Sequence, residues 1–303
     1  MSVNFCGIEL AHRIINGSGT FDAIAARRVF GDALLEQFPF AAFVSKTVTL
    51  APRQGNPPPR LWEIPGGMIN SIGLPNKGVA GYLAHDLPRL AELPVPLIVN
   101  VMGSAREDVA QLVSAFAERD EVAALELNVS CPNVKTGLIM GADPRELAGL
   151  LDAVRPRTDK PLIVKLTPNC ASPAEVAAAA EQHGADAVSL INTLRGMALD
   201  PHRPGEPWLG GGTGGVSGPA VRAIALTQVR EVRERISLPI IGMGGVQTGR
   251  HAVDLNTVGA QLVGVGTESF RDPLAAARVA AEASSLSEAF PANTPPAVAV
   301  VRH

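Results

Sequence analysis

Polar residues stand at the ends of short apolar segments of this sequence, and their types suit the binding of a polar, planar ring. Five of the segments carry or lead into asparagine or lysine. These polar positions are Ser45, Lys46, Thr47, Asn100, Asn128, Asn133, Lys165, Asn192 and Thr193. A carboxamide donates and accepts hydrogen bonds at once, which matches a ligand with ureide or imide groups or the edge of a flavin. The alternative for any single residue is that it caps the following turn or helix.

Two glycine-rich turns, GMGG (242–245) and GVGT (264–267), follow the last two apolar segments, and each precedes a helical pattern. Backbone amides of such turns bind phosphate, aided by the helix that follows. Glycine also serves tight turns that bind nothing. No GxGxxG motif with an acidic residue about 20 positions later is present. The pattern therefore predicts a phosphate-bearing cofactor and no dinucleotide site in this chain.

Cys131 and two lysines are the candidates for chemistry. Cys131 directly follows the fourth segment, where a thiol could act as a general acid or base, although an arbitrary cysteine is more often a small buried residue. None of the six histidines stands in a recognisable partnership with it, which disfavours a Cys–His hydrolase. Lys165 interrupts an apolar segment and therefore needs a ligand or a charge partner such as Glu126. Lys46 could be a surface charge.

The elements that must position these residues are eight apolar segments rich in valine and isoleucine. They are expected as strands at 13–17, 43–47, 96–101, 123–128, 161–166, 187–192, 239–243 and 261–266. Helices are expected at 105–118, 143–155, 173–183, 219–235, 247–258 and 272–283. Because the strands are apolar on both faces, they indicate a parallel sheet covered by helices. The α/β alternation predicts a (β/α)₈ TIM barrel whose polar strand ends meet at its C-terminal face.

The chain is expected to form one domain over residues 1–303. Residues 50–80 and 194–218 do not fit the alternation and are expected as loops inserted over the C-terminal face of the barrel. Residues 285–303 are rich in proline and alanine, which is typical of a loosely held tail.

Composition excludes several classes of partner. The net charge of −3 gives no electrostatic reason to expect a nucleic acid or an acidic membrane surface. The three cysteines, Cys6, Cys131 and Cys170, are too scattered for a disulfide framework, and no metal site is expected from them. No signal peptide and no apolar run of membrane-spanning length is apparent. A cytoplasmic protein is expected.

Nine motifs, spread in order over almost the whole chain, resemble those of dihydroorotate dehydrogenases. They are NGSGTF (16–21), SKTVT (45–49), NSIGLPNKG (70–78), NVSCPNVKTG (128–137), KLTPN (165–169), SLINTLRGM (189–197), GGVSGPA (214–220), GMGG (242–245) and GVGT (264–267). The resemblance implies an FMN-containing barrel that oxidises (S)-dihydroorotate to orotate in the de novo synthesis of the pyrimidine UMP. It makes Cys131 the base that removes a proton from C5 while hydride leaves C6 for the flavin. A cysteine at this position implies class 1.

Within class 1, SLINTL and NVKTG resemble subclass B. That resemblance implies a separate subunit carrying FAD and a [2Fe–2S] cluster, which passes the electrons to NAD⁺. It also implies a homodimer that joins with this subunit as a heterotetramer. Four thiolates for a cluster are not available in this chain. Members of the subclass often carry a second glycine where Leu138 follows Gly137 here, so the sequence departs from the pattern in the loop that bears Cys131.

The resemblance also assigns roles to individual residues. The substrate would meet Lys46, Asn70, Ser71, Ile72, Gly73, Leu74, Asn128, Asn133, Asn192 and Thr193. FMN would be held by Ser18, Lys46, Thr47, Asn100, Asn128, Lys165, Ile191 and Gly218, with its phosphate on Gly244, Gly245, Gly266 and Thr267. Lys165 would stabilise the anionic reduced ring. The loop from Cys131 to about Gly141 would shield the base from water.

Three other functions remain as alternatives. A flavin-dependent dihydropyrimidine dehydrogenase shares the amide-rich site and the cysteine, but the cysteine-rich cluster segment of such enzymes is absent from this chain. A fumarate-linked enzyme of subclass A differs only in its electron acceptor. A non-catalytic flavin carrier would be expected to lack Cys131.

Overall fold

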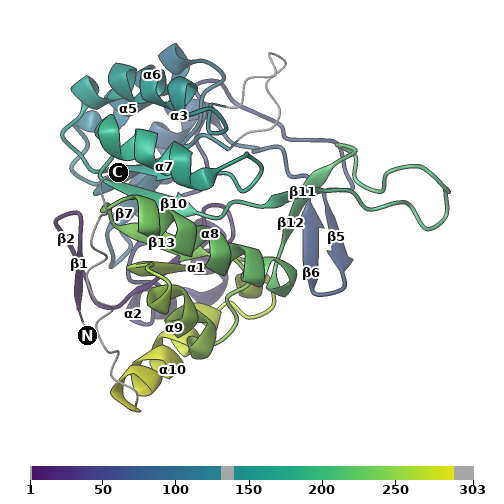
Figure 1. The fold of residues 1–303 in the computed structure, drawn as a ribbon. Coiled ribbons are helices and arrows are strands. Elements are labelled where there is room, and N and C mark those ends of the chain that lie inside the picture. The colour runs from purple at the N-terminus through teal and green to yellow at the C-terminus, as the bar shows by residue number, and fades with distance from the viewer. Residues whose placement is uncertain (1, 131–139, 290–303) are drawn as a thin grey trace.

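Eight parallel strands form the centre of the molecule in a computed structural model that describes residues 2–130 and 140–289 (Figure 1). They are β3 (Ile14–Asn16), β4 (Phe43–Val44), β7 (Leu97–Val101), β8 (Ala124–Asn128), β9 (Leu162–Lys165), β10 (Ala187–Leu190), β13 (Ile240–Met243) and β14 (Leu262–Val265). Their order is β3-β14-β13-β10-β9-β8-β7-β4. Each strand lies within a predicted segment, so the (β/α)₈ barrel is confirmed.

A side chain helps to close the barrel between β3 and β4, the strands at the two ends of this order. Asn16 at the end of β3 accepts a hydrogen bond from the Val44 amide at 2.7 Å and donates one to the Val44 carbonyl at 2.8 Å. The carboxamide thus adds to the backbone hydrogen bond from the Ala41 amide to the Ile14 carbonyl at this junction, since it can donate and accept together. Asn16 is fully buried. Asn16 was not among the site residues predicted from the sequence.

Helices surround the barrel, and the six predicted ones are confirmed with shifts of a few residues at their ends. They are α5 (Arg106–Ala117), α6 (Pro144–Val154), α7 (Pro173–Gln182), α8 (Arg222–Arg235), α9 (Gly249–Thr257) and α10 (Ala275–Ala289). Helix α7 shows why the sequence predicts where these helices begin. The Ser172 hydroxyl accepts a hydrogen bond from the Glu175 amide, and Pro173 occupies the first helical position. Helix α10 continues to Ala289, so the first residues of the expected tail are helical. Residues 290–303 lie outside the described part.

Shorter elements fill the connections. Four helices were not predicted, α1 (Ala23–Phe30), α2 (Ala33–Glu36), α3 (Gly78–Gly81) and α4 (Leu87–Leu90), with a π-helical turn at Tyr82–Asp86 before α4. Single 3₁₀ turns lie at Arg155–Arg157, Pro219–Val221 and Thr267–Phe270. Most of these segments are too short to show a helical period in the sequence.

The two inserted segments contain short strands that pair with each other, so the prediction that they are loops was wrong for these strands. They form an antiparallel sheet of β11 (Leu194–Gly196), β12 (Gly214–Ser217), β6 (Gly67–Asn70) and β5 (Leu61–Ile64), in the order β11-β12-β6-β5. Figure 1 shows this sheet projecting from the barrel. Its strands are short, and three of them contain glycine, so no alternating pattern marks them. The pairing also joins segments far apart in the chain.

The opposite end of the barrel is sealed. An N-terminal hairpin of β1 (Val3–Phe5) and β2 (Ile8–Leu10) packs its apolar residues against the first inward side chains of the strands. This cluster includes Val3, Phe5, Leu10, Ile98, Ala124, Ile163, Ala187, Ile241 and Leu262. Because side chains of a strand alternate, the residue two positions further along faces the same interior. The barrel interior is therefore apolar at the hairpin and changes toward the carboxyl ends of the strands.

Candidate active site

A layer of buried polar side chains lies one step above the apolar seal, on four neighbouring strands. It consists of Asn100 on β7, Glu126 on β8, Lys165 on β9 and Ser189 on β10, each at most 6% exposed. The register places Asn100 opposite Glu126 and Lys165 opposite Ser189. Each follows an apolar residue of the seal by two positions, so the four side chains point into the barrel together. These four residues lie at the bottom of the open, C-terminal end of the barrel, and we call them the floor.

Glu126 is the centre of this layer. One carboxylate oxygen accepts from the Asn100 side-chain amide at 2.5 Å, and the other accepts from the Ser189 hydroxyl at 2.7 Å. Within the described residues, Lys165 has no carboxylate within 4.0 Å. The sequence-based alternative of an ion pair between Lys165 and Glu126 is therefore wrong. A buried ammonium without an ion pair is costly, which leaves a ligand as its expected partner.

The rim of this end is built from the strand-end residues. The Ser18 hydroxyl donates to the Ser45 carbonyl at 2.8 Å, which ties the loop after β3 to the end of β4. The side-chain amide of Asn128 donates a hydrogen bond to the buried Thr47 hydroxyl at 3.4 Å. The structure thus brings Ser18, Thr47 and Asn128 together around the floor.

Lys46 lies on the rim, with part of its side chain exposed and part covered by its neighbours. Partial burial lowers the pKa of Lys46; Arg60 acts in the same direction, and Asp22 partly offsets both. The pKa shift follows from a low-dielectric setting that disfavours the charged form.

The antiparallel sheet carries the predicted substrate segment 70–74 to the rim. Asn70 ends β6 and donates to the Gly215 carbonyl of β12 at 3.3 Å. The Ser71 hydroxyl accepts from Asn56 at 2.8 Å. A Cβ on Gly215 would lie 1.9 Å from the Thr193 hydroxyl oxygen, so β12 passes directly against Thr193. The sheet therefore joins two groups of predicted substrate residues that lie more than a hundred positions apart in the chain.

Segment 70–74 itself has an unusual backbone. Gly73 has φ of 76° and Leu74 has φ of 55°. A Cβ on Gly73 would lie 2.4 Å from the Asn56 amide nitrogen, so only glycine fits. Ile72 accepts from the same amide through its carbonyl at 3.1 Å. The loop is thus held by Asn56, a residue that the sequence analysis did not identify.

Residues 191–193 follow β10 at the same end. The Ile191 amide donates to the Met243 carbonyl at 2.9 Å, and its side chain is buried. The Asn192 amide donates to the Leu166 carbonyl at 3.3 Å, while the Asn192 side chain accepts from the Thr193 amide at 2.8 Å. Cys131 and Asn133 lie outside the described residues.

The predicted phosphate residues form a glycine cradle after β13 and β14. Gly244 and Gly245 have φ of 138° and 68°, and a Cβ on either would lie within 2.8 Å of a neighbouring Cβ on α8. Gly218 has φ of 99° and lies close to Gly245. A Cβ on Gly245 would lie 2.9 Å from the Gly218 carbonyl oxygen. The Thr267 hydroxyl, after Gly266, donates to the Ser217 hydroxyl at 2.8 Å. Two loops from different strands therefore meet where the phosphate is expected.

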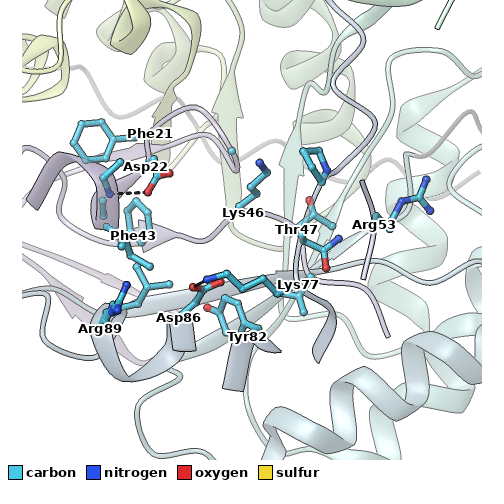
Figure 2. Close-up of a pocket in the computed structure, with 18 of the residues that line it drawn as sticks. Phe21, Asp22, Phe43, Lys46, Thr47, Arg53, Lys77, Tyr82, Asp86 and Arg89 are labelled. Atoms are coloured by element: carbon cyan, nitrogen blue, oxygen red, sulfur yellow. Dashed lines mark hydrogen bonds and ion pairs between the residues drawn. The ribbon is translucent and has the colours of Figure 1, made fainter. Parts of the chain in front are cut away.

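A cavity of about 600 Å³ opens beside this site, between α1 and the segment 75–90. Figure 2 shows Lys46 between Asp22 and Thr47, with Lys77 reaching toward Asp86. The cavity shares only Lys46 and Thr47 with the predicted flavin residues, so it is a side chamber rather than the predicted site. Its lining carries a surplus of cations in a chain of net charge −3. The charged lining residues are Asp22, Arg28, Lys46, Arg53, Lys77, Asp86 and Arg89.

The floor and the cradle fit an FMN molecule. The Asn100 side-chain oxygen is buried and has no hydrogen-bond partner among the described residues. An unsatisfied buried acceptor costs on the order of 1–3 kcal/mol, which a ring N–H would recover. Lys165, which has no ion pair within the described residues, suits the negative charge of a reduced flavin. The glycine turns suit a phosphate.

Two features of residues 2–130 and 140–289 bear on other classes of protein. No helix in residues 2–130 and 140–289 has the length and apolar character needed to cross a membrane. The same residues contain no group of three histidine, cysteine or acidic side chains placed to hold a metal ion.

The fold and the site together define a flavin-dependent oxidoreductase of the (β/α)₈-barrel class. A family model described as dihydroorotate dehydrogenase matches residues 1–286. The chain belongs to the dihydroorotate dehydrogenase family, and membership implies FMN as its flavin.

Curated relatives narrow the similarity to one type of the family. The chain is 44% identical over 282 residues to the "Dihydroorotate dehydrogenase B (NAD(+)), catalytic subunit" of Pelobacter propionicus, covering 92% of this chain and 91% of the relative. Proteins of the same name from Geobacter sulfurreducens and Desulforudis audaxviator are each 43% identical over 93% of this chain, and the matches cover 91% and 90% of those relatives.

Proposed function

We propose that this chain oxidises (S)-dihydroorotate to orotate with FMN as the hydride acceptor, in the synthesis of pyrimidines. The observation that carries the proposal is the floor of the open end, where, among the described residues, the buried Asn100 oxygen has no hydrogen-bond partner and Lys165 has no ion pair, beneath a rim of amides. Such groups are stable only if a ligand completes them. Membership in the dihydroorotate dehydrogenase family supplies the identity of that ligand and of the substrate.

The residues of the chain would have the following roles in the reaction. Asn70, Asn128 and Asn192 would bind the ring amides and orient the substrate. Cys131 would take the C5 proton on its sulfur as the general base. Lys165 would stabilise negative charge that develops on the cofactor. FMN, when bound, accepts the hydride from C6.

The electrons would then pass to NAD⁺ through a second polypeptide. The named relatives are catalytic subunits of an NAD⁺-linked enzyme, which implies a further subunit. This chain has three cysteines, fewer than the four thiolates that commonly hold a [2Fe–2S] cluster. The cluster and an FAD would therefore belong to the second subunit. We propose that two copies of the chain and two of that subunit form a cytoplasmic heterotetramer.

An anaerobic visible spectrum of the purified chain tests the proposal. A yellow protein whose flavin absorbance bleaches when dihydroorotate is added is the expected result. A yellow protein that dihydroorotate leaves unchanged would favour a dihydropyrimidine substrate or a non-catalytic flavin carrier. A chain that stays colourless after incubation with FMN would contradict the flavin site itself.

A cysteine substitution tests the role of the base. Cys131→Ala should keep bound FMN but lose turnover. Cys170→Ala is the matched control, because this half-buried thiol donates only to the Thr167 carbonyl, at 3.4 Å, and should leave turnover unchanged. Equal turnover in both variants would rule out Cys131 as the base. Comparing NAD⁺ and fumarate as acceptors, with and without an added second subunit, separates the two subclasses.

A further inference from the structure

Glu126 stands out as a buried acid with no role in the reaction described above. It is 2% exposed and lies beneath the rim, one strand from Lys165 on one side and from Asn100 on the other. Burying a carboxylate is costly unless it is fully hydrogen-bonded. Both of its oxygens accept a hydrogen bond, from Asn100 and from Ser189. Because burial of the Glu126 carboxylate is costly, this residue is expected to have a function in the site.

The contact with Glu126 fixes which way the Asn100 amide faces. A carboxylate only accepts hydrogen bonds, so the side of the amide that faces it must be the NH₂ group. The backbone of Asn100 is held independently, because its amide donates to the Ser45 hydroxyl at 3.2 Å and its carbonyl accepts from the Val48 amide at 2.8 Å. The side-chain oxygen of Asn100 is therefore left as a buried acceptor without a partner in the described residues.

We propose that Glu126 is a positioning residue that makes Asn100 present a hydrogen-bond acceptor, and not a donor, to the flavin ring. The inference rests on the proposed function for the identity of the ring. An asparagine free to turn could offer either its oxygen or its NH₂ group to the ligand. With Glu126 in place only the oxygen is offered, so the floor selects a ring N–H over a ring carbonyl at this point.

Exchange of the two functional groups tests this directly. In Glu126→Gln the new amide can donate to the Asn100 oxygen, which allows Asn100 to turn and to present its NH₂ group. We expect FMN to bind about tenfold more weakly, a change that corresponds to about 1.4 kcal/mol. In the double variant Glu126→Gln/Asn100→Asp, the glutamine donates to the new aspartate, whose other oxygen again faces the ring. FMN affinity should return toward that of the wild type.

The controls separate positioning from packing. Ser237→Ala removes an exposed serine–glutamate hydrogen bond of the same kind, to Glu181 and away from the floor, and should change FMN affinity less than twofold. Asn100→Asp alone places two carboxylates against each other and should weaken FMN more than Glu126→Gln does. The dissociation constant is measured by quenching of FMN fluorescence on the apoprotein, with thermal unfolding of each variant as the check on folding.

The outcomes are distinct. A double variant that binds FMN more tightly than Glu126→Gln supports the inference, since a purely structural role would make two core changes worse than one. Equal binding by wild type and Glu126→Gln, or a double variant that recovers nothing, overturns it while leaving the proposed function intact. A wild-type chain that binds no FMN overturns both.

Discussion

The two ends of one barrel interior differ in kind although both are buried. On β7 to β10 the seal has Ile98, Ala124, Ile163 and Ala187, and the floor two positions later has Asn100, Glu126, Lys165 and Ser189. The seal is covered by the β1–β2 hairpin. Among the described residues, the Asn100 oxygen of the floor has no hydrogen-bond partner and the Lys165 ammonium has no ion pair. Burial alone therefore does not distinguish packing from function.

If the seal serves stability and the floor serves the ligand, substitutions at the two ends should separate the two properties. The largest effect is expected at the seal. Phe5→Ala leaves a cavity beneath the hairpin, because Phe5 is only 1% exposed. The free energy of unfolding should fall by about 3–5 kcal/mol, with FMN affinity of the folded protein unchanged. Urea unfolding measures the first property and flavin fluorescence the second.

Phe30→Ala is the control for this loss of an aromatic ring, since Phe30 is 51% exposed on α1. It should change stability by less than about 0.5 kcal/mol. Equal losses in the two variants would mean that the hairpin does not seal the barrel.

The converse effect is expected at the floor. Lys165→Ala should lower the rate of dihydroorotate oxidation by about 10²–10³, the usual result of removing one electrostatic group from a reaction centre. Stability should change little, because the removed ammonium has no ion pair in the described residues. Turnover with an artificial dye and the melting temperature are the two measurements. Lys160→Ala, just before β9, is the control; a large loss of stability in Lys165→Ala would place this lysine with the structural groups.

A smaller effect is expected at the phosphate cradle. Gly245→Ala places a Cβ 2.8 Å from the Arg222 Cβ at φ of 68°. Strain of this kind costs on the order of 1–3 kcal/mol, so FMN should bind at least about tenfold more weakly. Gly205→Ala has a comparable φ of 85° but nothing within 4 Å of the added Cβ. It should strain the backbone and leave FMN affinity unaltered, and a loss of affinity in both would remove the special role of the cradle.

The smallest effect concerns pH at the sealed end. Burial, and to a lesser degree the positive N-terminus, lowers the pKa of His12 below its usual 6.5. Protons therefore bind more tightly to the unfolded chain, and His12 lowers the free energy of unfolding as pH falls below about 6.5, with no effect above it. Urea unfolding from pH 5 to 8 should show a shallower pH dependence in His12→Gln than in wild type. An identical slope would contradict the pKa shift.

Sequence patterns predicted the barrel because its strands and outer helices are regular. Continuous Val- and Ile-rich segments mark buried parallel strands, and helix α7 carries its start signal in Ser172 and Pro173. The antiparallel sheet was missed because glycine breaks the alternation in β6 and β12. Asn16 was missed as well, although it ends a strand as Asn128 does, because its partner Val44 belongs to another strand.

The class of fold, the glycine turns and the polar strand ends were predictable from the sequence, since each follows from local periodicity or residue type. Which of these groups come into contact depends on the three-dimensional arrangement of the strands. The antiparallel sheet brings segment 70–74 next to Thr193. Glu126 accepts hydrogen bonds from Asn100 and Ser189 and forms no ion pair with Lys165. Local patterns carry no record of contacts between distant segments, because those contacts arise from the register of neighbouring strands and the closure of the barrel.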